Sequence, residues 1–530
     1  MIQAPPPPYR WFSRGDLGAF FALMPDNMAT LAIMTAILLG FGVPADIVFG
    51  RMVPGTALGV LAGDLLYTWM AIRLARRSGN PATCAIPLGL DTPSTIGIVV
   101  CVLGPVFLEA KARGLSPVAA GAEALNIGVA TMLLIGLFKL ALSFCGGWIR
   151  RQVPAAALLG SLAGVGIALL GFMQLANLFT VPVAGMVSLA ILFFSLLGRM
   201  RLPRGFPGVL AAILAGAAIF HGMGAAGWNP GDYAPPPLHF YLHLPLPSLS
   251  GVAHLDDAFR HLSVSLPFAI LTVVGGINVS ASAHALGDAY RTRSVLMTEA
   301  FSTILAGLFG GVAQTTPYAG FPAYKAMGAR AGYTLAVGLF IGLGGILGYV
   351  SFIVELIPAS VLAPILIFLG IEVVAQPYLD CPRRHAAAVG LAILPGLARL
   401  LAIYLSNAAI LPPEALDRLL SEPSGAGFPP VLIVFVLGNG FILTGMLWGA
   451  FMAEMIDRRF GRACAALLIC AALSLFGIIH SPFAGGEMFW PWRIEGLPRQ
   501  VALQFSAAYL LTAALLFLLA RRSTPEPDAS

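Results

Sequence analysis

The sequence is poor in charged residues and in cysteine. Only 10% of its 530 residues are charged, whereas 58% are hydrophobic, and the mean hydropathy is +0.87. Soluble domains carry about 25% charged residues, so the composition excludes an ordinary soluble protein and indicates a chain that crosses a membrane many times. The six cysteines are scattered, without paired placement or metal-ligand spacing. We therefore expect neither a disulfide framework nor a metal site.

Clusters of catalytic or nucleic-acid-binding residues are also missing. The formal net charge is +6, but the basic residues form no patch of the kind that binds nucleic acid. No set of His, Asp and Glu residues or activated nucleophile suggests an active site. We expect a protein that is not an enzyme, has no cofactor, and meets a lipid bilayer and a small-molecule substrate.

What the chain does contain is a series of apolar runs, each suited to crossing a bilayer with about 20 residues per helix. The runs predict an all-α polytopic membrane protein with sixteen spans, near residues 17–42, 52–74, 94–108, 118–144, 154–179, 181–198, 207–221, 263–286, 296–310, 318–329, 332–350, 352–376, 385–406, 429–456, 461–481 and 501–520. The expected parts are a cytoplasmic tail (1–16), a first seven-span repeat (17–221), an extracytoplasmic loop (222–262), a second seven-span repeat (263–456), two additional spans (457–522) and a cytoplasmic tail (523–530).

The Lys and Arg residues fall mostly on one side of the membrane when the N-terminus is placed in the cytoplasm. Of the 30, 21 fall on the inner side, seven on the outer side and two within spans, Lys139 and Arg399. Cytoplasmic loops carry the excess of positive charge. The sequence thus predicts cytoplasmic termini at both ends, in a bacterial-type inner membrane.

The third and tenth apolar segments cannot be ordinary membrane helices. Residues 80–94 and 310–325 interrupt their segments with prolines and glycines. Proline removes a backbone donor, and irregular backbone at membrane depth is tolerated only beside protein or a watery cavity. Inverted-repeat transporters place such a break in each half. We expect the two breaks to form the substrate site; the alternative is a pair of polar loops at the membrane surface.

Together these segments resemble the nucleobase/ascorbate transporter family, the xanthine/uracil permeases. The likeness rests on 63–67 running into 80–82, on 266–288, on 301–311 running into 314–316, and on 355–364. It implies a seven-plus-seven inverted-repeat fold with broken third and tenth spans, a core domain of spans 1–4 and 8–11, and a gate domain of the rest. The last two spans go beyond the family's usual fourteen. A homodimer through the gate domain is also implied.

The resemblance places the substrate between the broken spans, facing polar residues of the eighth. Asn278 stands where the family usually has a carboxylate, and an amide cannot take up a proton. The expected substrate-binding residues are Leu88, Asn278, Ser282, Gln314, Thr315, Thr316, Tyr318 and Gly320. The neutral groups among them could instead join helices.

Ionisable residues inside spans are candidates for coupling transport to H⁺ or Na⁺. Asp91 is the best placed, at the start of a half-helix, although it could simply cap that helix. Glu299 could instead pair with Lys325 or Arg293. His284 and Asp26 complete the set.

The sequence therefore predicts a permease that carries a nucleobase, such as a purine, xanthine or uracil-like ring, by alternating access, with cation coupling. Two alternatives on the same fold stay open: a sulfate-permease-like anion transporter, and an uncoupled facilitator. A fully charged anion would favour a basic residue near the site, and Lys325 is the one candidate that the sequence suggests.

Overall fold

The computed structural model describes residues 9–144, 154–200, 202, 203, 206, 208–229, 231–233, 235, 242–407, 410–422 and 425–522. The predicted tail 523–530, the first half of the tail 1–16, Cys145 and parts of the predicted loop 222–262 lie outside these residues.

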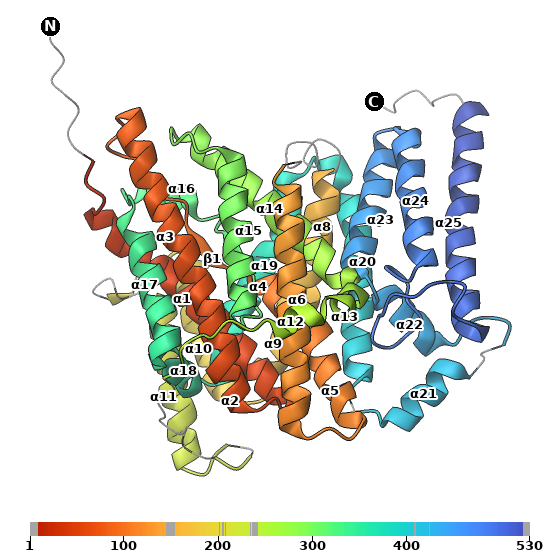
Figure 1. Cartoon of the computed structure of the whole chain (residues 1–530), viewed down its shortest axis with the longest axis horizontal. Coiled ribbons are helices and arrows are strands. Elements are labelled where there is room, and N and C mark those ends of the chain that lie inside the picture. The colour runs from red at the N-terminus through yellow and green to blue at the C-terminus, as the bar shows by residue number, and fades with distance from the viewer. Residues whose placement is uncertain are drawn as a thin grey trace, which may run out of the picture. The chain divides into compact units, whose positions relative to one another are not determined.

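The described chain is almost entirely helical (Figure 1). The helices are α1 (Arg14–Phe41), α2 (Ala45–Ile47), α3 (Val53–Ser78), α4 (Thr92–Ile98), α5 (Gly104–Ala112), α6 (Pro117–Leu142), α8 (Ala155–Val165), α9 (Met173–Leu178), α10 (Pro182–Leu196), α11 (Gly208–Ala225), α12 (Ser250–Ala253), α13 (Leu255–Arg260), α14 (Leu262–Ala285), α15 (Thr292–Leu308), α16 (Phe321–Ala326), α17 (Gly332–Leu347), α18 (Tyr349–Leu356), α19 (Ala359–Asp380), α20 (Ala386–Leu405), α21 (Pro413–Ser421), α22 (Pro430–Gly438), α23 (Phe441–Ile456), α24 (Phe460–Leu475) and α25 (Gly496–Arg522). Short π-helical turns at Val48–Met52, Val99–Leu103 and Gly166–Phe172 join α2 to α3, α4 to α5 and α8 to α9. The strands are β1 (Leu88–Leu90) and β2 (Thr315–Pro317).

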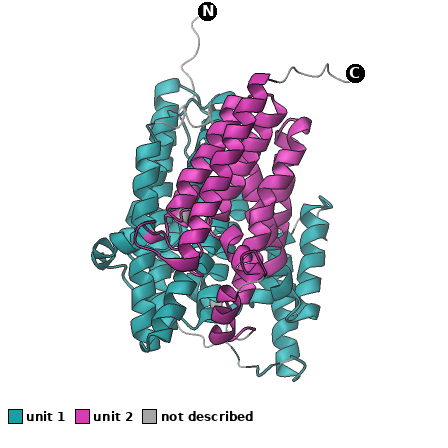
Figure 2. Cartoon of the chain, turned by 90° about the vertical axis from the view of Figure 1, so that its right-hand side faces the viewer, with its two compact units in different colours: residues 1–149, 174–259, 268–366 teal, residues 150–173, 260–267, 367–530 magenta. Residues whose placement is uncertain are grey.

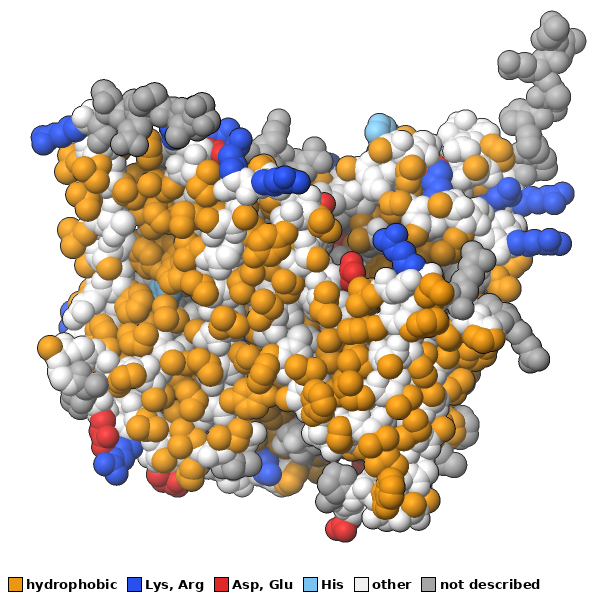
Figure 3. Space-filling model, turned by 180° about the vertical axis from the view of Figure 1, so that it is seen from behind, with side chains coloured by type: hydrophobic (Ala, Val, Ile, Leu, Met, Phe, Trp, Pro, Cys, Tyr) orange, Lys and Arg blue, Asp and Glu red, His pale blue; other side chains and the backbone are white. Residues whose placement is uncertain are grey.

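The polytopic membrane architecture predicted from the sequence is confirmed. Among the described residues, ten helices are long and apolar enough to cross a membrane, and a bent pair makes an eleventh. Three shorter apolar helices, α10, α17 and α24, lie at the predicted spans 181–198, 332–350 and 461–481. Hydrophobic side chains cover most of the face seen in Figure 3, as a surface in contact with lipid tails requires.

The third and tenth spans are broken where the sequence predicts. The third consists of β1 followed by the helix Thr92–Ala112, and the tenth consists of β2 followed by the short α16.

Two other predicted spans are not single straight helices. The segment 352–376 is divided between α18 and α19, because Pro358 between them has no amide hydrogen to continue a helix. The segment 429–456 forms α22 and α23, which are bent by 80° at Asn439 and Gly440. Gly440 has a φ of +70°, and a Cβ there would lie 2.5 Å from the carbonyl oxygen of Ile478. Only glycine fits this bend.

The chain divides into two compact units (Figure 2). Unit 1 comprises Met1–Ile149, Gln174–Phe259 and Phe268–Leu366, and unit 2 comprises Arg150–Met173, Arg260–Pro267 and Ile367–Ser530. Unit 1 therefore contains the first four spans, the sixth and seventh (α10 and α11), most of the eighth, the ninth to eleventh, and the first part of the twelfth. Unit 2 contains most of the fifth span, the rest of the twelfth, the thirteenth and fourteenth, and the two additional ones.

Within unit 1, α3 packs closely on both α17 and the start of the second break. A Cβ at Gly55 would lie 2.3 Å from the amide nitrogen of Gly311, and one at Gly338 would lie 2.7 Å from Cβ of Asp64. The missing side chains let the backbones touch, as is typical of helix packing in membranes. This contact fixes the segment that leads into β2.

Within unit 2, the loop between α24 and α25 binds the bend between α22 and α23. The Asn439 amide donates to the carbonyls of Ser481 (2.9 Å) and Phe483 (2.7 Å). The ring of His480 is bonded to the carbonyl of Val436 (3.0 Å) and to the hydroxyl of Tyr509 (2.7 Å). The bend and the loop thus satisfy backbone carbonyl groups of each other.

Candidate functional site

The candidate site is built around the pairing of β1 with β2 in unit 1. The strands are antiparallel, with Leu88 opposite Pro317, Gly89 opposite Thr316 and Leu90 opposite Thr315. Two further backbone bonds extend the pair, from the Asp91 amide to Gln314 (3.0 Å) and from the Tyr318 amide to Pro87 (2.8 Å). Each broken span thereby satisfies the backbone donors and acceptors of the other.

A half-helix starts after each strand. Because β1 and β2 pair antiparallel, the two helix starts lie on either side of this strand pair, which we call the crossing. Asp91 is the N-cap of α4, and its carboxylate accepts a bond from the Ser94 amide (3.0 Å). Gly320 is the N-cap of α16 and has no side chain to bond that helix start. The start of α4 is therefore capped by a carboxylate, whereas the start of α16 has no side-chain cap.

Helix α1 supports the crossing from a third side. The Asn27 side-chain oxygen accepts a bond from the Leu90 amide (2.8 Å), and the hydroxyls of Thr30 and Thr92 are 2.6 Å apart. Asp26 is half-buried and close enough to Asp91 and Tyr318 to interact with them electrostatically. Two carboxylates therefore lie near the crossing.

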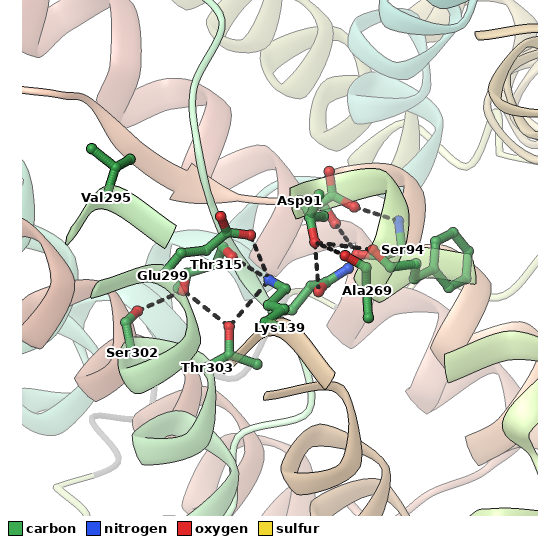
Figure 4. Close-up of polar contacts among 12 residues, drawn as sticks. Asp91, Ser94, Lys139, Ala269, Val295, Glu299, Ser302, Thr303 and Thr315 are labelled. Carbon is green, nitrogen blue, oxygen red and sulfur yellow. Dashed lines mark hydrogen bonds and ion pairs between the residues drawn. The ribbon is translucent and has the colours of Figure 1, made fainter. Parts of the chain in front are cut away.

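A buried ion pair lies beside β2 (Figure 4). The ammonium of Lys139, from α6, is 2.8 Å from the carboxylate of Glu299, from α15, and both side chains are fully buried. The same ammonium donates to the carbonyl oxygen of Thr315 (2.8 Å) and to the hydroxyl of Thr303 (3.3 Å). The pair therefore joins two spans to the central strand.

Hydroxyl groups complete the contacts around β2. The Thr315 hydroxyl is 2.5 Å from that of Ser302 and 3.3 Å from that of Thr303. From α14, the Thr272 hydroxyl donates to the Gln314 side chain at 3.5 Å. Thr315 and Gln314 are fully buried, so they hold the strand in place, while Thr316 is only half-buried.

The structure brings most of the predicted substrate-binding residues together. Leu88 and Thr315 to Tyr318 lie in or next to the strand pair, Gln314 precedes it, and Gly320 starts α16. Asn278 and Ser282 lie farther along α14 than Thr272, the residue of that helix that bonds Gln314. Asn278 is exposed and Ser282 is half-buried. Their role in binding stays a prediction.

The coupling candidates occupy different surroundings. Asp91 makes the cap that the sequence offers as the simpler alternative. Glu299 is paired with Lys139, not with Lys325 or Arg293; Lys325 pairs with Asp288, and the Arg293 guanidinium lies 4.1 Å from the Phe144 ring centroid. His284 is exposed near the end of α14. Coupling through any of these groups stays a prediction.

Lys139 is the residue of this site that sequence reasoning missed. Lys325 is the basic residue that the sequence suggests near the site. It lies at the far end of α16 and is bound instead to Asp288. The signal was available, because a lysine within the apolar 26-residue helix Pro117–Leu142 is costly and needs a partner. Among the described residues, no group of three or more His, Cys, Asp and Glu side chains is placed to hold a metal ion.

Comparisons with known proteins identify the fold and not the family. No protein-family model and no curated protein matches this chain. The transmembrane domain of a cyanobacterium bicarbonate transporter, BicA, is 16% identical, with 74% of this chain and 96% of that chain covered and a TM-score of 0.49. A structure of SLC26A9 is 12% identical, with 84% and 65% covered and a TM-score of 0.52. Murine SLC26A9, described as an anion transporter in the inward-facing state, is 16% identical, with 73% and 66% covered and a TM-score of 0.51.

The chain spans about two thirds of the length of the two SLC26A9 chains. The likeness confirms the predicted fold class, a seven-plus-seven inverted-repeat transporter fold with broken third and tenth spans and two extra spans at the C-terminal end. At these identities it establishes the fold alone. Neither SLC26A9 structure is described as a nucleobase/ascorbate transporter, the family that the sequence resembles, and the murine one is described as an anion transporter.

Proposed function

We propose that this chain is a membrane carrier of a small anion, which binds at the crossing of β1 and β2 and is moved by alternating access. The observation that carries the proposal is the pairing of β1 with β2, which sets the starts of two half-helices, α4 and α16, on either side of one strand pair. Helix starts attract anions because their amide groups and dipole are positive. The description of murine SLC26A9, which shares the fold, as an anion transporter supports this substrate class.

The charges around the crossing favour a monovalent anion. Asp91 occupies the start of α4, and Asp26 lies nearby. The positive charge of Lys139 is balanced by Glu299. A divalent anion would meet two carboxylates, with only one helix start that no carboxylate caps in its favour. We propose that H⁺ accompanies the anion and is carried by Asp91 or Asp26, since a proton removes the charge that repels the substrate.

A second candidate is a planar neutral ring such as a nucleobase. The rings of Tyr318 and Tyr324 are stacked beside the crossing, with centroids 6.2 Å apart and planes 15° apart. Aromatic side chains of this kind favour a flat ligand, and carboxylates accept hydrogen bonds from ring N–H groups. This candidate needs no free positive group.

The proposal includes the placement of the chain. The excess of Lys and Arg on one side supports a bacterial-type inner membrane protein with both termini in the cytoplasm. The homodimer through the gate domain stays a prediction.

The function is tested by uptake into proteoliposomes loaded with unlabelled solute. The labelled panel is chloride, bicarbonate, formate, sulfate, uracil and xanthine, and each is measured with and without an inward proton gradient. We expect uptake of a monovalent anion that the gradient increases. Uptake of uracil or xanthine alone would establish the second candidate, and uptake of sulfate alone would contradict the charge argument.

Matched tryptophan variants place the site. In Gly320→Trp, the new Cβ would already lie 2.9 Å from the Tyr318 ring. We therefore expect that this variant still inserts into the membrane but takes up no solute. The control is Gly222→Trp, because Gly222 is exposed on α11 and a Cβ there would meet nothing within 4 Å. Normal uptake by Gly320→Trp would remove the start of α16 from the site.

A further inference from the structure

The ammonium of Lys139 is held entirely by oxygen atoms. Its partners are a carboxylate oxygen of Glu299 at 2.8 Å, the carbonyl oxygen of Thr315 at 2.8 Å and the hydroxyl of Thr303 at 3.3 Å. They come from α15 and β2, whereas the lysine comes from α6. Figure 4 shows these three groups converging on the side-chain nitrogen.

This donor set is one that binds cations. Carboxylate, carbonyl and hydroxyl oxygens are the ligands that hard metal cations use in proteins. A lysine ammonium is a compact charge with three N–H donors, and three oxygens surround it here. The cage carries one formal negative charge, from Glu299, and its occupant carries one positive charge.

The cage is also part of the transport site. Thr315 lies in β2, one residue before the half-buried Thr316 and opposite Leu90 of β1. A cation bound to the Thr315 carbonyl therefore sets the position of the strand to which, on the proposed function, the solute binds. A mobile cation at this place would couple its own movement to that of the solute, whereas a tethered one cannot leave.

We propose that Lys139 is a built-in cation that takes the place of a co-transported alkali ion in an oxygen cage next to β2, so that transport does not need sodium. The inference rests on the proposed function and deepens it, because it restricts the coupling ion to one bound elsewhere, such as H⁺ on Asp91. Lys139 acts as a positioning residue, since its ammonium contacts the strand and not the solute.

The cage is tested first without any solute. Lys139→Ala removes the ammonium and leaves the oxygens, and its melting temperature is compared in equal concentrations of choline, sodium, lithium, potassium and methylammonium chloride. A ligand that binds only the folded protein raises its melting temperature. We expect the variant to melt below the wild type in choline and to recover about half of the loss or more in one small cation or in methylammonium. We expect the wild type to melt at the same temperature in all five salts, because its cation site is already filled.

A matched variant separates the cage from general salt effects. Lys139→Ala/Glu299→Gln keeps the vacated space but loses the carboxylate, so no cation should restore it. Equal recovery in both variants, or no recovery in a folded Lys139→Ala protein, would overturn the proposal.

The wild-type protein provides a test that does not depend on how the variants fold. Replacing sodium by choline on both sides of the proteoliposome membrane should leave the initial uptake rate within about twofold, because the cation site is already filled. A larger loss in choline would overturn the built-in cation while leaving the proposed function intact. The absence of uptake for every solute would instead overturn the proposed function, and the melting series would still test the cage.

Discussion

The ammonium of Lys139 and the carboxylate of Glu299 lie 2.8 Å apart, and both side chains are fully buried in unit 1. The carbonyl oxygen of Thr315 lies at the same distance from the ammonium. Helices α6 and α15 are thus joined to β2 at one point, and the pair fixes the strand as well as balancing two charges. Its loss therefore affects both stability and the geometry of the site.

Breaking this pair from one side is predicted to destabilise the protein strongly. Glu299→Gln leaves a buried ammonium without its counter-ion, and such a change costs about 3–5 kcal/mol in the free energy of unfolding. Removing both charges, as in Lys139→Met/Glu299→Gln, should cost less than Glu299→Gln alone. The melting temperatures of both variants in detergent, compared with that of the wild type, check these two predictions.

The surface pair of Arg113 with Glu123 is the control for these variants, because its side chains are partly exposed. Glu123→Gln should change the free energy of unfolding by about 1 kcal/mol or less. If Glu123→Gln and Glu299→Gln lowered the melting temperature equally, the buried pair would have no special importance.

The sequence was sufficient for the fold because its strongest signals are local. Apolar length defines the spans, and the prolines and glycines of 80–94 and 310–325 define the breaks, since no helix continues through them. The bend between α22 and α23 was missed because no proline stands at or beside Asn439 and Gly440 to indicate it. The sharp turn depends on a distant loop, in which Ser481 and Phe483 supply the partners of Asn439.

The site was predicted only in part, for a related reason. The two breaks in the sequence contain the residues of the crossing, so Thr315, Thr316 and Tyr318 could be predicted as substrate-binding residues. The pairing of Lys139 with Glu299 joins residues 160 positions apart, and the sequence analysis named Lys325 and Arg293 instead as possible partners of Glu299. Choosing among them requires the packing of α6 on α15, which no local pattern encodes.

The approach of α3 to the second break predicts that Gly55→Ala will be damaging. A Cβ at this position would lie 2.3 Å from the Gly311 amide nitrogen and 2.4 Å from the Phe309 carbonyl oxygen, both backbone atoms that cannot rotate away. Overpacking of this kind costs about 1–3 kcal/mol. The shift it forces on residues leading into β2 should also lower uptake. Melting temperature and initial uptake rate are the two measurements.

Gly40→Ala, in α1, is the matched substitution, because a Cβ at Gly40 would meet nothing within 4 Å. Gly40→Ala should leave the melting temperature unchanged or raise it slightly, since alanine forms helices better than glycine. A harmless Gly55→Ala would show that α3 and the break separate freely.

The additional spans predict a stability effect at Asn439. Asn439→Ala leaves the carbonyls of Ser481 and Phe483 without their donor, and unsatisfied buried groups cost about 1–3 kcal/mol each. We expect a lower melting temperature and faster proteolysis of the loop between α24 and α25. Thr512→Ala is the control, because the exposed Thr512 bonds only to Ala508 in its own helix. Equal effects of the two substitutions would contradict a bracing role for this loop.

Beyond the end of α23, Asp457 predicts a pH dependence of stability. Its carboxylate accepts bonds from the His385 ring and from the Arg384 side chain, each at 2.9 Å. These bonds, chiefly that from His385, lower the pKa of Asp457 below its ordinary value of 3.8. A carboxyl group with a lowered pKa in the folded state stabilises the protein above its unfolded pKa, and this stabilisation is lost as the pH falls through the folded value. Asp457→Asn should therefore melt below the wild type at pH 7, and the two should converge below about pH 3.

The comparison needs a carboxylate without such partners in the same unit. Asp417 is exposed on α21, so Asp417→Asn should follow the wild type at every pH. Melting curves of the three proteins between pH 7 and about pH 2 in one detergent check this directly. A constant difference between Asp457→Asn and the wild type across the whole range would mean that the substitution acts through packing. The bonds from His385 and Arg384 would then contribute nothing that depends on the charge of Asp457, because a charged contribution must disappear once the carboxylate is protonated.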